Sequence, residues 1–150
     1  MKVGIIGCGN ISETYFNSQK LYNNFEIISC ADINDEAAKN SAQKFNIKNQ
    51  SIEDILSNNQ IDLIINLTIP SAHKKIIIDS LTAGKHCFSE KPLAINIIES
   101  NEILEISKRK NLYVGCAPDT FLGSAGQKAR RLIDENEIGN IVLGTFNLMS

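Results

Sequence analysis

Apolar and polar residues follow two periods along the chain, one typical of buried strands and one of helices packed on a sheet. Short, mostly apolar runs predict strands at Lys2–Gly7, Phe25–Asp32, Asp62–Leu67, His86–Glu90, Leu112–Ala117 and Ile141–Met149. The stretches between them predict helices at Asn10–Tyr22, Asp35–Phe45, Ser71–Ala83, Ala94–Lys110 and Gly123–Glu137, and Ser51 is expected to cap a further short helix. Continuously apolar strands separated by helices predict a doubly wound α/β fold, with a parallel sheet covered on both faces.

Composition excludes several protein classes. Hydrophobic residues make up 43% of the 150, which is ordinary for one globular domain and argues against disorder or a coiled coil. Fifteen basic and seventeen acidic residues give a net charge of −2 without a basic block, so we expect no nucleic-acid partner. No apolar run reaches the roughly 18 residues of a membrane span, and the first residues do not resemble a signal peptide. We therefore expect a cytoplasmic protein with no membrane partner.

The four cysteines are Cys8, Cys30, Cys87 and Cys116. None shows the two-residue spacing of a zinc or redox pair, so no metal site is expected. Each lies in or just after an apolar strand-like run. We interpret them as reduced, buried thiols.

The segment from Gly7 to Ser12 follows the first predicted strand and opens the first predicted helix, which is the context of a dinucleotide-binding turn. Gly7 permits the tight turn, and Gly9 lets the backbone approach a pyrophosphate. The helix N-terminus, with Asn10 and Ile11, offers free N–H groups to that anion. Ser12 replaces the third glycine and is small enough for close packing. The alternative is a plain turn between a strand and a helix.

Asp32 ends the second predicted strand, 20 residues after Ser12. An acid at this point can accept both ribose hydroxyls of adenosine and would repel a 2′-phosphate, so NAD is favoured over NADP. The alternative is a helix N-cap, a role that Asp32, Asn34 and Asp35 all suit.

The loop after the Asp62–Leu67 strand also lies at a carboxyl end, where ligands of open α/β sheets bind. Thr68 can contact a dinucleotide through its backbone or its hydroxyl. Pro70 and Ser71 suit a helix start on structural grounds alone. His73 is a further candidate for the cofactor site, although a histidine near a helix start is more often a surface or packing residue.

Glu90, Lys91 and Pro92 follow the next predicted strand. A lysine beside the positive ring of an oxidised nicotinamide would have its ammonium form destabilised, which suits it to proton transfer. Pro92 stiffens the loop and restricts Lys91 to extended conformations. The alternative is an ordinary solvated turn.

Taken together, these segments resemble the Gfo/Idh/MocA oxidoreductases, named after glucose–fructose oxidoreductase and inositol dehydrogenase. The resemblance rests on GIIGCGNIS at 4–12, AD at 31–32, Thr-x-Pro-x-x-His at 68–73, AGKHCFSEKPL at 83–93 and RLIDENEIGNI at 131–141, and it covers essentially the whole chain. It implies a Rossmann domain over 1–120 that binds NAD or NADP. It also implies that Lys91 takes part in proton transfer or substrate orientation and that Glu90 lies near the nicotinamide ribose.

The chain departs from the family pattern in two ways. Cys116 to Phe121 stand where many members carry an Asn or His and an Arg near the substrate, so Asp119 and Thr120 are candidates for binding substrate hydroxyls or for a polar turn. Members are also more than twice as long, and 121–150 would be only a helix and first strand leading into their second domain. We therefore expect no dehydrogenase turnover from 1–150. The Ile141–Met149 strand, deprived of its sheet, would form an open edge suited to homo-oligomer formation.

The leading interpretation is the NAD-binding half of a dehydrogenase that oxidises a hydroxyl carbon of a sugar, inositol or polyol. A non-catalytic module that senses dinucleotides is the first alternative; the short length favours it and Glu90-Lys91-Pro92 disfavours it. An S-adenosylmethionine methyltransferase is the second, because it also uses a glycine turn and an acid after the second strand. The Thr68–His73 and Glu90–Pro92 segments argue against it.

Overall fold

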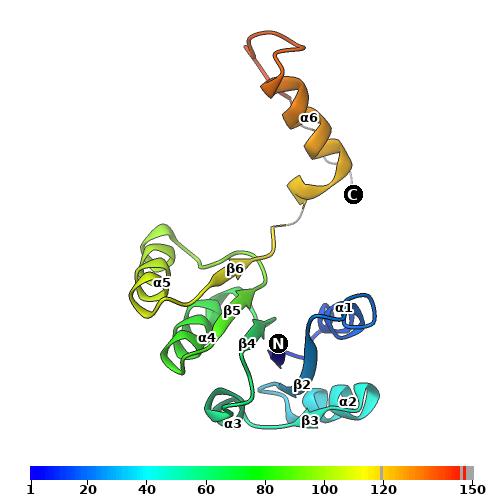
Figure 1. Ribbon diagram of the computed structural model, residues 1–150, viewed down its shortest axis with the longest axis vertical. Helices are drawn as coiled ribbons and strands as arrows, with labels where there is room; N and C mark the ends of the chain where they lie inside the picture. Colours follow the sequence, from blue (N-terminus) through cyan, green and yellow to red (C-terminus); the bar gives the residue numbers. More distant parts are fainter. Residues whose placement is uncertain (119, 146, 148–150) are drawn as a thin grey trace. The chain divides into compact units, whose positions relative to one another are not determined.

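A parallel six-stranded sheet forms the centre of the described chain (Figure 1). The computed structural model describes residues 1–118, 120–145 and 147. The strands run in the order β3-β2-β1-β4-β5-β6, and each adjacent pair is parallel. Their bounds are β1 Lys2–Ile6, β2 Glu26–Ala31, β3 Lys48–Asn49, β4 Leu63–Asn66, β5 His86–Ser89 and β6 Val114–Cys116. This arrangement confirms the predicted doubly wound α/β fold.

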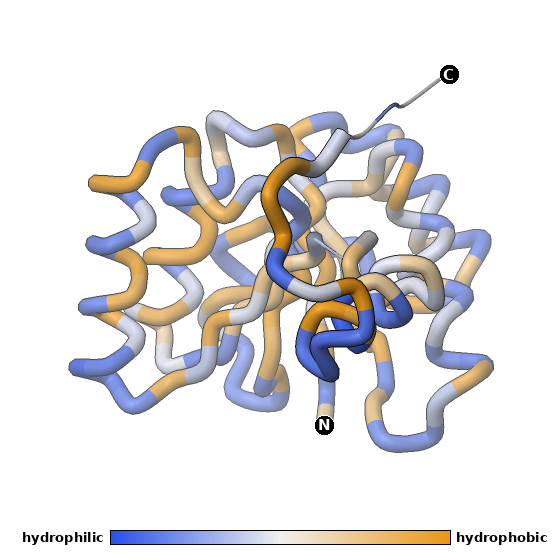
Figure 2. The backbone as a smooth tube through the Cα atoms, turned by 90° about the horizontal axis from the view of Figure 1, so that it is seen from above, coloured by the Kyte–Doolittle hydropathy of each residue, from blue (hydrophilic) through white to orange (hydrophobic). Residues whose placement is uncertain are grey.

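Helices cover both faces of this sheet. The helices that do so are α1 Ser12–Ser18, α2 Asp35–Phe45, α3 Ile52–Ser57, α4 Pro70–Thr82 and α5 Ile97–Lys110. Further along the chain are a short 3-10 turn at Thr120–Leu122 and the helix α6, Ser124–Asp134. Phe16 of α1 and Ala38 of α2 pack against one face. Ile55 of α3, Ile77 of α4 and Ile103 of α5 pack against the other. Figure 2 shows hydrophilic and hydrophobic stretches alternating along the helices, which is the pattern of helices that bury one side.

Side-chain caps set several helix boundaries. The side chains of Asn34, Ser51 and Asn96 accept backbone N–H groups at the starts of α2, α3 and α5. Asn46 and Asn111 adopt left-handed backbone conformations at the ends of α2 and α5. The predicted cap at Ser51 is therefore confirmed.

Some predicted boundaries were wrong. The first helix occupies only Ser12–Ser18 instead of Asn10–Tyr22, and α5 begins at Ile97 rather than Ala94, because Asn96 caps it. The two-residue strand β3 was not predicted. In the predicted strand Ile141–Met149, residues 141–145 and 147 form no strand, and 146, 148 and 149 lie outside the described residues. The open edge expected there is therefore not present in the described part.

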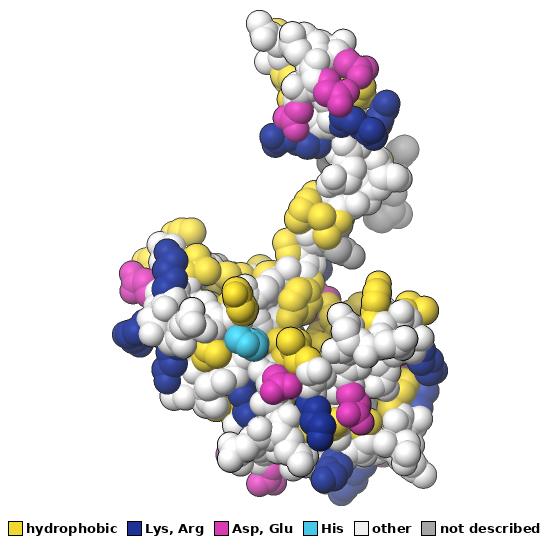
Figure 3. Space-filling model, viewed as in Figure 1, with side chains coloured by type: hydrophobic (Ala, Val, Ile, Leu, Met, Phe, Trp, Pro, Cys, Tyr) yellow, Lys and Arg dark blue, Asp and Glu magenta, His cyan; other side chains and the backbone are white. Residues whose placement is uncertain are grey.

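The chain divides into two compact units, Met1–Ala117 and Pro118–Ser150. The first holds the sheet. In the second, α6 has no buried residue. Within the described residues, no helix is both long and apolar enough to cross a membrane. On the face of the first unit shown in Figure 3, acidic and basic side chains are interspersed.

Candidate functional site

The turn after β1 depends on the absence of a side chain at Gly7. Its φ is +107°, and its N–H donates to Ala31 O at 2.8 Å, which ties the turn to the end of β2. A Cβ at Gly7 would lie 2.5 Å from the carbonyl carbon of Leu67. Gly9 differs, because it is exposed and a Cβ there would meet no atom within 4 Å. Gly7 therefore shapes the turn, while Gly9 leaves open space above it.

Asp32 joins the end of β2 to this glycine turn. One carboxylate oxygen accepts the N–H of Cys8 at 2.6 Å, and the other accepts the N–H of Asn34 at 2.7 Å. The N-cap of α2 is Asn34, whose side chain accepts from Glu36 and Ala37. Since each carboxylate oxygen has two lone pairs, Asp32 keeps acceptor capacity for a further hydroxyl.

A cleft of about 650 Å³ opens between the glycine turn, the end of β2 and the start of α4. Its walls are mainly apolar, and they include Gly9, Asp32, Ile33, Leu56, Thr68 and Ala72. The cleft lies at the carboxyl ends of β1, β2 and β4. In the strand order, β1 separates β2 from β4, so this is the point where the direction of winding reverses and where ligands of such sheets bind.

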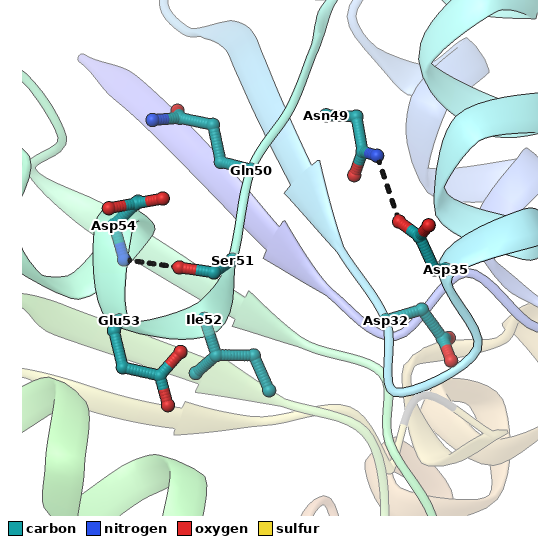
Figure 4. Close-up of a pocket in the computed structure, with 8 residues that line it drawn as sticks. All are labelled: Asp32, Asp35, Asn49, Gln50, Ser51, Ile52, Glu53 and Asp54. Atoms are coloured by element: carbon teal, nitrogen blue, oxygen red, sulfur yellow. Dashed lines mark hydrogen bonds between the residues drawn. The ribbon is translucent and has the colours of Figure 1, made fainter.

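A second, polar cleft of about 430 Å³ adjoins Asp32 (Figure 4). Four carboxylates line it: Asp32 and Asp35 lie on one side, and Glu53 and Asp54 lie on the other. Asp35 forms an exposed ion pair with Lys39 and accepts from Asn49 Nδ2 at 3.3 Å, and the hydrogen bond from Lys39 lowers the pKa of this carboxyl. The region beside Asp32 is thus strongly acidic.

The Glu90–Pro92 loop follows β5 and is held across the sheet by hydrogen bonds. Glu90 N donates to Asn66 O at 2.9 Å, and one Glu90 carboxylate oxygen accepts the hydroxyl of Tyr15 from α1 at 2.7 Å. The other oxygen accepts the N–H of Lys91 at 3.0 Å. The peptide bond between Lys91 and Pro92 is cis, and the Lys91 side chain is exposed. Lys91 therefore stands on an anchored loop with its ammonium group accessible.

His73 lies inside the protein rather than in the open cleft. It is 1% exposed, and its two ring nitrogens lie 2.6 Å from Pro92 O and 2.9 Å from Thr68 O. The ring thus connects the loop after β4 to the loop after β5. Its contacts are those of a packing and positioning residue, because both ring nitrogens lie within hydrogen-bond distance of backbone carbonyl oxygens.

Buried polar groups continue this connection. Asn66 is fully buried and donates to Ser89 Oγ at 3.1 Å, while its side-chain oxygen accepts the hydroxyl of Thr68 at 2.7 Å. Sequence reasoning missed Asn66, Ser89 and Tyr15. Asn66 and Ser89 are polar residues at the last positions of apolar strands, which was the available sign; nothing local marked Tyr15.

Other predicted site residues are distributed as follows. Asn10 and Ile11 are exposed in the turn before α1, and Pro70 is the first residue of α4. Asp119 lies outside the described residues. Thr120 opens the 3-10 turn in the second unit, and its side chain is not described.

Comparison with known proteins decides the family. The Gfo/Idh/MocA model, described as an oxidoreductase family with an NAD-binding Rossmann fold, matches residues 1–117. The chain belongs to the Gfo/Idh/MocA oxidoreductases. It is 29% identical over 146 residues to Oxidoreductase P35 of Formosa agariphila, covering 93% of this chain and 44% of that protein. It is 28% identical over 142 residues to glucose-6-phosphate 3-dehydrogenase of Bacillus subtilis, covering 94% and 40%.

A solved structure gives the same fold. The WlbA dehydrogenase from Chromobacterium violaceum, in complex with NADH and UDP-GlcNAcA, superimposes with a TM-score of 0.86 at 24% identity, over 93% of this chain and 41% of that one. This Gfo/Idh/MocA chain therefore spans about two fifths of the length of these relatives. It is an NAD(P)-binding Rossmann domain of an oxidoreductase family.

Proposed function

We propose that this chain is the cofactor-binding half of an NAD-dependent dehydrogenase that acts on a hydroxyl carbon of a sugar or polyol. The observation that carries the cofactor assignment is the position of Asp32, which is bonded to the glycine turn and borders an apolar cleft. Residues 1–120 would form the dinucleotide-binding domain, and 121–150 would lead into a substrate domain. We retain the cytoplasm as the expected compartment.

The glycine turn fits the pyrophosphate of a dinucleotide. The space above Gly9 admits a phosphate close to the backbone, and the exposed amides of Asn10 and Ile11 are neighbouring donors. The adenosine end would occupy the apolar cleft that Leu56 and Thr68 line, beside the start of α4 at Pro70. Its ribose hydroxyls would donate to Asp32.

Selection of NAD over NADP would follow from charge. A 2′-phosphate would lie against Asp32 and face the polar cleft that Asp35, Glu53 and Asp54 also line. Like charges at such short range are strongly unfavourable, whereas a ribose hydroxyl donates to the same carboxylate. Glu53 lines both clefts, so the acidic wall is continuous with the adenosine site.

The nicotinamide end would lie near Glu90 and Lys91. A bound nicotinamide would supply the hydride acceptor. Lys91 would take the proton of the substrate hydroxyl, and the hydrogen bond between Tyr15 and Glu90 would hold its loop in place. The substrate class is proposed from the relatives, one of which is named as a glucose-6-phosphate dehydrogenase acting at carbon 3.

Calorimetric titration of 1–150 with NADH, NADPH and S-adenosylmethionine tests this proposal. We expect NADH to bind and NADPH to bind at least tenfold more weakly. Asp32→Asn should lower the affinity for NADH and reduce the difference between the affinities for NADH and NADPH. The matched variant Asp35→Asn should keep the affinity for NADH. Equal binding of NADPH and NADH by the unmodified chain would contradict the role of Asp32. Binding of S-adenosylmethionine alone would contradict the dehydrogenase assignment.

A further inference from the structure

Two cysteines, Cys8 and Cys30, belong to one buried cluster at the glycine turn. Cys8 lies between Gly7 and Gly9, and Cys30 lies on β2, two residues before Asp32. Both belong to the buried cluster on the sheet face that α1 and α2 cover. The N–H of Gly7 donates to Ala31 O, which continues the pairing of β1 with β2 and brings the turn alongside Cys30. Cys8 Sγ lies 3.6 Å from the carbonyl oxygen of Ala31, the residue that follows Cys30, so the two thiols are neighbours on the same face of the sheet.

The surroundings of the two sulfur atoms differ. The hydrogen bond from Cys30 lowers the pKa of the Cys8 thiol below its ordinary value, and a hydrogen bond from Ser41 acts in the same direction. The same pairing with Cys8, together with burial, raises the pKa of Cys30 strongly. Cys8 Sγ also lies 3.6 Å from Ala31 O, and Cys30 Sγ lies 3.5 Å from Ala38 O. Cys8 is thus the better nucleophile, and Cys30 keeps its proton.

Of the two cysteines, only Cys8 is accessible to solvent. Cys8 is 9% exposed and lines an open cleft of about 700 Å³ together with Gly9, Ser41 and Lys44. Cys30 is fully buried. The remaining thiols lack such a partner in the described structure: Cys87 is buried with its pKa raised to about 12, and burial also raises the pKa of Cys116.

We propose that Cys8 and Cys30 form an oxidisable dithiol that closes to a disulfide when the chain meets a hydroperoxide, and that this disulfide reduces dinucleotide binding. The Cys8 thiolate attacks the peroxide oxygen, the O–O bond breaks, and a sulfenic acid and one water result after proton uptake. Cys30 sulfur then attacks the sulfenic sulfur, a second water leaves with the thiol proton, and the S–S bond forms. In sum, two thiols and one hydrogen peroxide give one disulfide and two waters.

The disulfide would act through the turn that carries Cys8. An S–S bond of about 2.0 Å is shorter than any contact between two free thiols, and we propose that the turn shifts toward β2 as this bond forms. Cys8 N donates to Asp32 at 2.6 Å, and Gly9 follows directly. The shift therefore changes the proposed pyrophosphate and ribose contacts together. This part of the inference rests on the proposed function.

The test starts with the reduced 1–150 chain, treated with a small excess of hydrogen peroxide and analysed by intact mass and by peptide mapping without reduction. We expect the loss of two hydrogen atoms and a peptide that links Cys8 to Cys30. Cys30→Ala should instead accumulate oxygen on Cys8, and Cys8→Ala should resist oxidation. Cys87→Ala, a matched removal of another buried thiol, should still form the link. Peptide mapping of the unmodified chain identifies the linkage even if a variant folds poorly.

Binding completes the test. Oxidised chain should bind NADH at least tenfold more weakly than reduced chain, and dithiothreitol should restore the affinity. A link between other cysteines, or no link, would overturn the proposal. A link between Cys8 and Cys30 with unchanged NADH affinity would overturn its effect on binding. If reduced chain binds no NADH, the proposed function fails, while the mass and peptide analysis still decides whether the dithiol closes.

Discussion

Replacing Gly7 with alanine tests whether this glycine is needed for the conformation of the turn, as distinct from the binding of a cofactor to it. The added methyl would lie 2.5 and 2.6 Å from the carbonyl carbon and oxygen of Leu67 and 2.8 Å from Thr68 N. All three atoms are backbone, so no side chain can rotate to relieve the overlap. The φ of +107° is also one that an L-residue rarely adopts.

The expected destabilisation has two parts. Holding a non-glycine residue at such a dihedral costs about 1–3 kcal/mol. Forcing a methyl into a closed space typically costs about 1–3 kcal/mol more. Even the lower sum, about 2 kcal/mol, corresponds to a fall of roughly 4–8 °C in Tm for a chain of this size.

Gly9→Ala is the matched control. Its Cβ meets no atom within 4 Å, so the free energy of unfolding should change by less than about 0.5 kcal/mol. The same methyl would occupy the space proposed for the pyrophosphate. We therefore expect Gly9→Ala to keep the Tm of the unmodified chain while binding NADH at least tenfold more weakly.

Thermal unfolding followed by circular dichroism, combined with NADH titration, measures both quantities. A Tm of Gly7→Ala within 2 °C of the unmodified chain, against a fall of about 4–8 °C at the least, would refute the steric argument. Full NADH affinity in Gly9→Ala would refute the placement of the pyrophosphate.

Three further predictions concern stability. Ser51→Ala removes the side chain that accepts Asp54 N at 3.0 Å, and urea unfolding should show a loss of about 1 kcal/mol; a change near zero would mean that the cap contributes nothing. His73→Ala leaves the carbonyls of Thr68 and Pro92 without their ring partner and opens a cavity, so it should cost about 2–4 kcal/mol, against less than about 0.5 kcal/mol for the exposed Lys91→Ala; similar values for the two would contradict the positioning role. Burial lowers the pKa of Lys85 below 10.5 in the folded chain, so between the folded-state pKa and 10.5 the unfolded chain binds more protons and the free energy of unfolding should rise with pH. Lys85→Met should remove that rise, and an identical pH dependence in the variant would contradict the role of Lys85.

The fold could be predicted from the sequence where an element has a local sequence pattern of its own. The run Lys2–Ile6 is apolar, short and ended by glycine, and Asp35–Phe45 places small residues on one face. The two-residue strand β3 has no such pattern, since Lys48 and Asn49 are both polar. They form a strand only because β2 lies beside them. In the same way, residues 141–145 are apolar enough for a strand, but a strand also needs a partner that composition does not supply.

Positions in the candidate site could be predicted where they follow from the strand that a residue comes after. Gly7 and Asp32 could be assigned from their places after strands, because the turn and the strand end dictate what they can contact. His73 could not, since its role depends on two carbonyls from different loops, Thr68 and Pro92. The bond between Tyr15 and Glu90 joins residues 75 positions apart, a separation that no local pattern encodes.

The order of the strands in the sheet differs from the order in which they are synthesised. Strand β1 lies third from one edge of the sheet, yet it is synthesised first, and its Val3 must pair with Leu63 of β4. At about 5–20 residues per second, a ribosome would complete β4 roughly 3–12 s after β1. During that interval one side of the central strand has no partner, although β2 can already cover the other. We therefore expect early pairing of β1 with β2 to protect the apolar residues of β1 from association with other chains.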